Sequence, residues 1–186
     1  MRIQHIDTVY SYHSYKTLRR ISHNFASTNM LSSIILHGFQ AKICVNQSNK
    51  YESSFNPAQF KKGKKVSSVV SLIEEASLFG CELACLPEHW IFTKDFNSIL
   101  NSFIDVARKN EIAILTGGCY VENNDAKEIV CYAINKEGGV IGSQKKVHLY
   151  EAEKEVAIPG NEYNVFDING YKVGVAICYD LFFLKL

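Results

Sequence analysis

Helix-like and strand-like segments alternate in the middle of the chain, and this alternation restricts the possible folds most strongly. Apolar side chains recur at helical spacing over residues 66–79 and again over residues 99–107. Each of these stretches leads into a compact apolar run, at residues 82–86 and 112–115, which is too short for a helix and suits a buried strand. With a short alternating run at residues 41–46 as a first strand, the pattern predicts an α/β domain.

The second half of the chain changes to strands without helices between them. Strand-like runs cover residues 129–134, 139–145, 165–168 and 172–177. Asn169-Gly170 separates the last two, and this dipeptide is the strongest short signal for a two-residue hairpin turn. We therefore expect a sheet of paired strands after the alternating region.

Size and charge exclude several classes of protein. With 186 residues, of which 47% are hydrophobic, the chain can bury the core of one ordinary domain. The net charge of +1 gives no surplus of positive charge for phosphates, so we expect no nucleic acid partner. No apolar stretch approaches the roughly 20 residues that cross a bilayer, so we expect no membrane association.

Six cysteines are spread along the chain. They stand at positions 44, 81, 85, 119, 131 and 178. No clear secretory signal precedes them, and several lie in apolar runs, where a free cysteine behaves as a small hydrophobic residue. Cys81 and Cys85 form the one close pair, which is too little for a structural zinc site. We expect no metal site, and we expect five of the six cysteines to be packing residues.

The first part of the chain differs in composition from the rest. No acidic residue occurs between Asp7 and Glu52, and serine is frequent there. Such a composition resembles an organelle transit peptide, but it also suits a poorly ordered tail or a stretch upstream of a true start at Met30. We expect a poorly ordered extension over residues 1–36 and a domain over residues 37–186. We expect a cytoplasmic location, or a mitochondrial or other organelle location if the extension is a transit peptide.

Three reactive side chains follow predicted strands, where chemistry collects in α/β folds. Glu88 follows one apolar run, Lys146 follows another and Cys178 ends the last strand. A thiol attacks a carbonyl carbon if a carboxylate takes its proton, and an ammonium and the backbone N–H of Tyr179 can hold the oxyanion. Taken one at a time, each side chain also has an ordinary structural interpretation: Glu88 as a solvated loop residue, Lys146 as a surface charge and Cys178 as a core residue.

Four segments give this arrangement a family resemblance. LPEHW (residues 86–90), KKVHLYEAEK (residues 145–154) and GVAICYDLFF (residues 174–183) resemble, in this order, the three catalytic motifs of the carbon–nitrogen hydrolase (nitrilase) superfamily. IPGNE (residues 158–162) looks like the family's proline-glycine segment. The resemblance extends from about residue 41 to the end, and it implies an α/β fold that is the N-terminal part of a four-layer α-β-β-α sandwich.

The resemblance also implies a role for each side chain. Glu88 corresponds to the general base, Lys146 to the oxyanion stabiliser and Cys178 to the nucleophile, with the Tyr179 amide as a second oxyanion donor. Glu153 looks like the family's second glutamate. Glu153 also lies in a mixed-charge run that is ordinarily a solvated face, and both interpretations stay open here.

The implied function is an amidase of the cysteine thioester type. Cysteine attacks an amide carbon, ammonia or an amine leaves, and water releases a carboxylate, without any cofactor. The Cys-Tyr-Asp context of Cys178 looks like that of the amidase branches. We expect a small-molecule amide as substrate and a possible homo-oligomer, with nitrilase or N-carbamoyl amine hydrolase activity as alternatives.

The sequence departs from the family at its C-terminus. Relatives continue from the nucleophile motif into further helices and strands, whereas this chain ends with LFFLKL (residues 181–186). We expect a domain that lacks about a third of its family fold, with an unpaired apolar edge at residues 173–177. An inactive fragment that at most binds a partner through this edge is therefore an alternative to an active enzyme, and an unrelated α/β binding module is a third interpretation.

Overall fold

The computed structural model describes two short stretches near the N-terminus and most of the chain from Val66 onward. The described residues are 7–8, 32–36, 66–86, 88, 96–123 and 126–183. The helices are α1 (Val66–Leu78) and α2 (Phe96–Asn110), with 3-10 helices η3 (Glu151–Glu155) and η4 (Cys178–Phe183). The strands are β1 (Asp7–Thr8), β2 (Ser32–Leu36), β3 (Leu83–Cys85), β4 (Ala113–Leu115), β5 (Cys119–Asn123), β6 (Ala126–Ile134), β7 (Val140–Lys145), β8 (Val165–Ile168) and β9 (Tyr171–Ile177).

The alternating region forms the predicted α/β unit. Strand β3 leads through α2 into β4, and the two strands pair in parallel with Leu83 opposite Ala113. Both helices are amphipathic, and the apolar side chains of each face the same core. Gly80, at a φ of 76°, adopts a left-handed backbone that follows the end of α1, as expected for a glycine after a helix.

The long strand β6 organises the first sheet. Its residues pair with β7 on one side, while β5 and then β4 run along the other, all antiparallel to it. Strand β6 begins three residues before the expected start at Ile129. Strand β5 is absent from the sequence prediction, because a five-residue strand ending in Val121-Glu122-Asn123 shows no clear alternation of polar and apolar side chains.

The second sheet has the order β1-β2-β9-β8. The hairpin of β8 and β9 turns at Asn169 and Gly170, whose φ values of 53° and 81° match the predicted turn type. Strand β9 also pairs in parallel with β2, so that Val173 lies opposite Ser32. The expectation of an unpaired edge at residues 173–177 is therefore wrong, because β9 lies between two neighbours.

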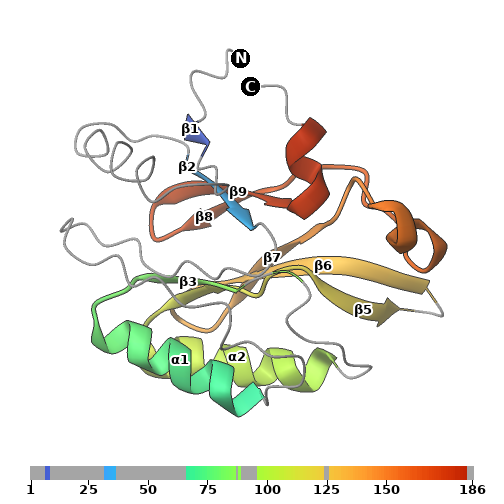
Figure 1. Cartoon of the computed structure of the whole chain (residues 1–186). Helices are drawn as coiled ribbons and strands as arrows, with labels where there is room; N and C mark the ends of the chain where they lie inside the picture. The colour runs from blue at the N-terminus through green and yellow to red at the C-terminus, as the bar shows by residue number, and fades with distance from the viewer. Residues whose placement is uncertain are drawn as a thin grey trace, which may run out of the picture.

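The two sheets and the helices form stacked layers (Figure 1). One apolar cluster joins α1 and α2 to the first sheet, and a second cluster fills the space between the sheets. Successive residues of β4 show the division, since Ile114 belongs to the helix side and Ala113 and Leu115 to the side between the sheets. The described residues thus supply an α-β-β arrangement, three layers of the expected four.

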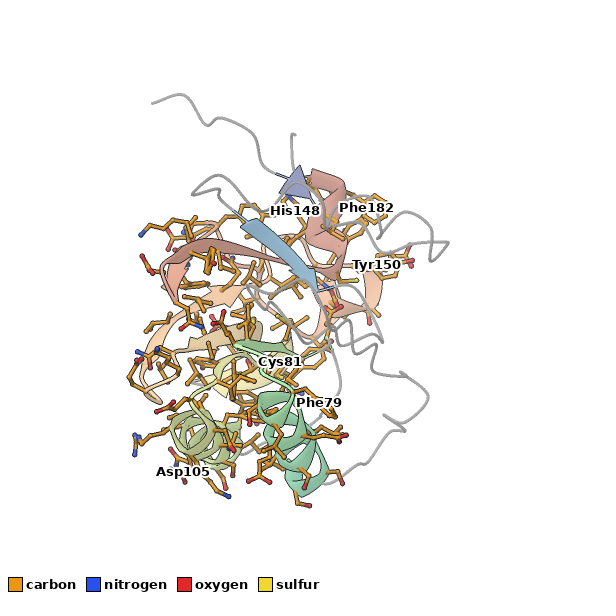
Figure 2. All side chains as sticks on the ribbon, turned by 90° about the vertical axis from the view of Figure 1, so that its left-hand side faces the viewer. Phe79, Cys81, Asp105, His148, Tyr150 and Phe182 are labelled. Carbon is orange, nitrogen blue, oxygen red and sulfur yellow. The ribbon has the colours of Figure 1, made fainter. Side chains whose placement is uncertain are left out.

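The side chains fill the space between these layers (Figure 2). Cys85, Cys119 and Cys131 are buried and do not form disulfides, as expected for packing residues. Cys81 lies buried where α1 meets the first sheet, but it is disulfide-bonded, which corrects the expectation of a packing thiol at this position. In the part of the chain that the structure describes, no group of three or more potential ligands is arranged to hold a metal ion.

Two predictions concern segments that are largely outside the described residues. The predicted strand at residues 41–46 lies outside them. Strand β2 falls within residues 1–36, the segment assigned to an N-terminal extension, and it is part of the second sheet. Residues 37–65 lie outside the described residues, so the boundary between residues 36 and 37 stays a prediction. Among the described helices, none combines the length and the apolar character needed to span a membrane.

Candidate active site

The three reactive side chains predicted from the sequence lie at the ends of strands from both sheets. Glu88 follows β3 and Lys146 directly follows β7 in the first sheet, while Cys178 directly follows β9 in the second. The side chains of Glu88 and Lys146 are buried, and Cys178 is half-buried. The structure therefore brings together residues that are far apart in the sequence.

A buried ammonium between two carboxylates forms the centre of this site. Lys146 Nζ lies 2.7 Å from Glu88 Oε1 and also 2.7 Å from Glu153 Oε1. The Lys146 side chain is 0% exposed, so both contacts are shielded from water. The lysine backbone is held as well, because its N–H donates to the Ile129 carbonyl and its own carbonyl accepts from the Gly160 N–H.

Glu153 belongs to the site and not to a solvated face. It lies in η3, and its side chain is 11% exposed although its neighbours Glu151 and Lys154 are exposed. Oε1 of Glu153 contacts Lys146, while Oε2 accepts a hydrogen bond of 2.7 Å from the Tyr150 N–H at the start of η3. One carboxylate thus caps the short helix and holds the lysine.

The two carboxylates keep Lys146 charged. Burial alone lowers the pKa of a lysine, but the charges and hydrogen bonds of Glu88 and Glu153 outweigh it and hold the pKa of Lys146 above its ordinary value. Two carboxylates and one ammonium leave an excess of one negative charge beside the thiol when all three are ionised.

Cys178 has an unusual backbone and a protonated thiol. Its φ is 48°, in the left-handed region that residues other than glycine seldom adopt. Burial, the charge of Glu88 and a hydrogen bond to the Glu88 side chain raise the pKa of the thiol to about 12. The thiol is therefore neutral near pH 7, and it donates to the carboxylate that could accept its proton.

Tyr179 follows Cys178 directly in the short helix η4. The first N–H groups of a helix lack acceptors within it, so the Tyr179 amide is placed to serve as a donor. Its ring contacts Tyr150 edge-on, with centroids 5.3 Å apart, and Phe183 at 5.2 Å. The aromatic side chains near Tyr150 and Phe182 gather at the end of the molecule away from α1 and α2 (Figure 2).

Two residues that the sequence analysis did not select also shape the site. Gly118 faces Glu88 and Ile177: a Cβ atom there would lie 2.7 Å from Ile177 Cγ2 and 3.1 Å from Glu88 Cγ. Asp180 is completely buried and bonded to backbone N–H groups near Lys146 and Cys178. The sequence did offer a signal for Asp180, which is an acidic residue just after an apolar run. No local pattern marks Gly118.

A surface hollow elsewhere takes no part in this arrangement. It is lined by Glu82, Glu111, Lys136 and Asn169. Glu82 precedes β3 and Asn169 precedes β9, so the hollow lies at the strand ends opposite to those that carry the reactive groups.

The sequence that carries these side chains matches the profile of a known family. Residues 50–186 match that of the carbon-nitrogen hydrolases. The chain belongs to the carbon-nitrogen hydrolase family. This membership confirms the resemblance inferred from the motifs, and the matched segment includes all of the predicted site residues.

Curated relatives of this carbon-nitrogen hydrolase chain are 27–31% identical to it over the matched segments. Nitrilase homolog 2 of Dictyostelium discoideum is 30% identical over 149 residues, covering 67% of this chain and 45% of the relative. A nitrilase of Pyrococcus abyssi is 31% identical, with 69% and 54% covered. An omega-amidase of Xenopus laevis is 27% identical, with 67% and 52% covered. The chain thus spans about half the length of the curated relatives it matches.

Solved structures support the fold. An amidase from Nesterenkonia sp. AN1, whose active-site cysteine carries acrylamide added by Michael addition, superimposes with a TM-score of 0.55 at 20% identity. The match covers 62% of this chain and 51% of the amidase. A carbon-nitrogen hydrolase from Helicobacter pylori G27 gives a TM-score of 0.56 at 17% identity, covering 62% and 46%. The α/β fold class predicted from the sequence is thereby confirmed.

Proposed function

We propose that the protein hydrolyses the carbon–nitrogen bond of a small amide, with Cys178 as nucleophile, Glu88 as general base and Lys146 as oxyanion stabiliser. The observation that carries this proposal is the shared position of Glu88, which accepts the hydrogen bond of the Cys178 thiol and contacts Lys146 at 2.7 Å. One carboxylate thus touches both the nucleophile and the cation.

In the first half-reaction, Cys178 Sγ attacks the amide carbon while its proton passes to Glu88. The raised pKa of the thiol makes a free thiolate scarce, so proton transfer has to accompany the attack. Glu88, now protonated, gives the proton to the departing nitrogen. The C–N bond breaks, ammonia or an amine leaves, and a thioester on Cys178 remains.

The negative charge on the substrate oxygen needs donors that are already in place. The Lys146 ammonium is fixed by two carboxylates, and the Tyr179 amide begins the helix that carries the nucleophile. Fixed donors in a site with little water stabilise such a charge more than mobile water does. In the second half-reaction, water loses a proton to Glu88 and attacks the thioester, which releases a carboxylate and restores the thiol.

The two glutamates differ in their remaining contacts, and this difference supports distinct roles. The second oxygen of Glu153 is occupied by the Tyr150 N–H, so this carboxylate is committed to holding Lys146. Glu88 contacts the thiol and is the group placed to exchange protons. We therefore assign Glu88 as the base. Glu153 orients Lys146 and helps to keep it protonated.

Several relatives support amides as substrates, although a nitrilase of Pyrococcus abyssi also matches. Omega-amidases from Xenopus, mouse and human are among the proteins that match, and mutants of the amidase from Nesterenkonia sp. AN1 have been solved in complex with acrylamide and butyramide. Together with the Cys-Tyr-Asp context of Cys178, these matches support short aliphatic amides as the substrate class. We also propose that residues 37–186 form the hydrolase domain.

The test is ammonia release from acrylamide and butyramide, combined with intact-mass analysis of the protein. Wild type is expected to release ammonia, and Cys178→Ala neither to release ammonia nor to gain mass. Glu88→Gln is expected to lose at least about 100-fold of the hydrolysis rate. It should still form an acrylamide adduct on Cys178, because loss of the neighbouring charge lowers the pKa of the thiol.

Glu128→Gln is the matched control. Glu128 contacts Lys145 at 2.6 Å, next in the sequence to Lys146, but this pair lies outside the site. Removing its charge should leave ammonia release unchanged. Equal ammonia release from wild type and Cys178→Ala, or none from wild type with either amide, would contradict the proposal.

A further inference from the structure

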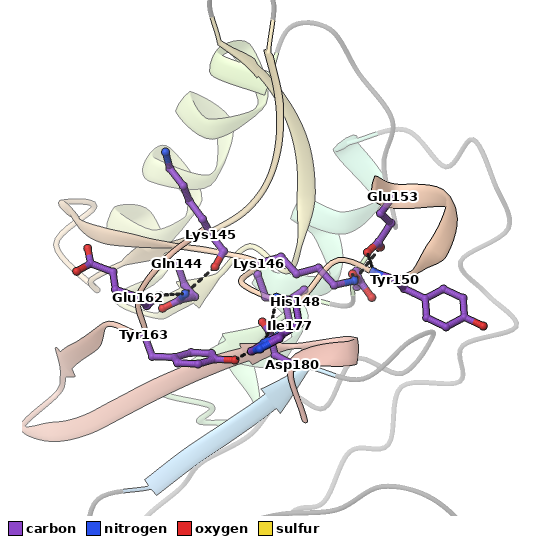
Figure 3. A network of polar contacts seen from close by, with 11 residues as sticks. Gln144, Lys145, Lys146, His148, Tyr150, Glu153, Glu162, Tyr163, Ile177 and Asp180 are labelled. Carbon is purple, nitrogen blue, oxygen red and sulfur yellow. Dashed lines mark hydrogen bonds and ion pairs between the residues drawn. The ribbon is translucent and has the colours of Figure 1, made fainter. Parts of the chain in front are cut away.

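We propose that Asp180 is a positioning residue that ties the turn carrying Cys178 to the loop carrying Lys146. This inference deepens the proposed function, because it concerns the placement of the nucleophile against Glu88 that the function requires. It rests on the contacts of one buried carboxylate, which Figure 3 shows between two parts of the chain.

The Asp180 carboxylate accepts hydrogen bonds from both sides of the site. Oδ2 accepts from the Ile177 N–H at 3.0 Å, and Oδ1 accepts from the His148 N–H at 2.7 Å. Nδ1 of His148 lies 3.2 Å from Oδ1 and 3.1 Å from the Tyr163 hydroxyl, and burial and the charge of Asp180 raise the pKa of this hydroxyl. The side chain is 0% exposed, so these donors replace the water that a free carboxylate would bind.

The bond to Ile177 closes a turn around the nucleophile. Ile177 precedes Cys178, and Asp180 follows it after Tyr179, so the side chain of Asp180 spans the one residue of this turn with a left-handed backbone. A non-glycine residue in this conformation costs about 1–2 kcal/mol relative to an ordinary backbone. The hydrogen bond offsets this cost and holds the thiol at its observed angle.

The bond to His148 joins this turn to the other sheet. His148 follows Lys146 closely, in the loop after β7, whereas Asp180 belongs to the helix after β9. One carboxylate therefore connects the loop of the proposed oxyanion stabiliser with the turn of the proposed nucleophile. A substitution at Asp180 should therefore change the contact between the Cys178 thiol and Glu88, although neither of these two residues is itself replaced.

A carboxylate suits this position better than an amide. Both of its oxygens accept hydrogen bonds, and its partners here are donors. In Asp180→Asn, one oxygen becomes an NH₂ group that faces a backbone N–H, so one of the two bonds is lost at nearly constant size. The variant is therefore the smallest change that weakens the connection.

The test follows the reaction of Cys178 with methyl methanethiosulfonate, a neutral reagent that is not an amide, across the pH range 6–11. The wild-type midpoint lies above this range, because the pKa of the thiol is about 12, so a lowered midpoint is detected as a faster reaction at each pH, where the thiolate fraction is larger. The groups that face the thiol are Glu88, Lys146 and Glu153, and those that face Asp180 are His148 and Tyr163. If Asp180 holds the thiol against Glu88, Asp180→Asn should lower the midpoint of the Cys178 profile by about 1 pH unit or more. Ammonia release should fall at least tenfold in the same variant.

The sharpest readout is the combination with Glu88→Gln. Glu88→Gln should lower the midpoint by itself, and adding Asp180→Asn should lower it little further, because the contact that Asp180 maintains is already gone. An additive shift in the double variant, or an unchanged midpoint in Asp180→Asn, would overturn the proposal. These thiol readouts do not require turnover, so they remain decisive even if no amide is hydrolysed.

A structural defect is distinguished by the other thiols. Cys85, Cys119 and Cys131 are buried, and they should stay unreactive in Asp180→Asn if the fold is intact. Reaction of all these thiols together with Cys178 would mean that Asp180 only stabilises the fold, which overturns the proposal. Asp167→Asn, which removes an exposed carboxylate that pairs with Lys172, is the matched control and should leave the profile unchanged.

Tyr163→Phe provides a second variant that is milder than Asp180→Asn. It removes the hydroxyl that interacts with Asp180 but keeps the ring. The proposal expects a smaller shift of the Cys178 midpoint in the same direction. A shift in the opposite direction, or no shift in Tyr163→Phe and Asp180→Asn alike, would count against Asp180 as the connection.

Discussion

Lys146 and Glu88 are 58 positions apart in the sequence, yet their Nζ and Oε1 atoms lie 2.7 Å apart in a buried contact. The contact exists because β3 and β7 belong to one sheet and end on the same side of the site. Glu153 then adds a second carboxylate from the short helix after β7. The charge balance of the site follows from these three side chains, and so do several expectations that experiments can check.

Cys178 should be a slow thiol toward simple reagents. Burial and Glu88 raise its pKa to about 12, so at pH 8 its thiolate fraction is far below that of an ordinary cysteine with a pKa of about 8.5. We expect its reaction with methyl methanethiosulfonate to be about 100- to 1000-fold slower than that of an exposed cysteine. Peptide mapping after timed labelling measures this rate, and a rate like that of a free thiol would contradict the expected pairing.

Lys146→Met should destabilise the fold strongly. The substitution leaves Glu88 and Glu153 buried without their cation, and breaking a buried ion pair in this way costs about 3–5 kcal/mol. The free energy of unfolding from urea titrations at pH 7.5 measures the loss. Lys145→Met removes an exposed lysine next in the sequence and should cost less than about 1 kcal/mol.

The stability difference between wild type and Lys146→Met should also depend on pH. The pKa of Lys146 is raised in the folded protein, so its contribution to stability is fully present below the ordinary lysine pKa of about 10.4. It is lost as the pH rises through the higher folded value. Urea titrations of both proteins between pH 8 and 11.5 should show a constant difference that shrinks only at the alkaline end. A difference that already shrinks well below the ordinary lysine pKa would contradict this.

Gly118→Ala should damage the site more than its size suggests. The added Cβ would lie 2.7 Å from Ile177 Cγ2 and 3.1 Å from Glu88 Cγ, so one or both side chains must move. We expect a loss of about 1–3 kcal/mol in stability and a tenfold or greater fall in ammonia release. Gly174→Ala is the control, because a Cβ there meets nothing within 4 Å, and both measurements should stay near wild type.

Gly170→Ala should affect stability without affecting the thiol. Its φ of 81° is a conformation that alanine adopts only at a cost of about 1–2 kcal/mol, although space for the methyl group is available. Thermal unfolding should therefore shift to lower temperature while the pH profile of Cys178 labelling stays unchanged. An altered labelling profile would show that the hairpin turn is coupled to the site at the far end of β9.

The fold class and three candidates for the reactive side chains could be predicted from the sequence. The periodicity of residues 66–79 and 99–107 and the compact runs after them depend on local patterns, and Asn169-Gly170 specifies its own turn. Glu88, Lys146 and Cys178 stood out because each follows such a run and because their surroundings resemble known motifs. These features are local, so they are visible before the chain is folded.

The role of the remaining residues depended on the tertiary structure, because contacts between distant segments leave no local pattern. Strand β9 is an interior strand since β2 pairs with it, which no property of residues 173–177 reveals. Gly118 matters only because Glu88 packs over it, and the mixed-charge run around Glu153 becomes part of a site only where it meets Lys146. The sequence alone thus determined which side chains are candidates for the chemistry, and the packing of two sheets decided which of them meet.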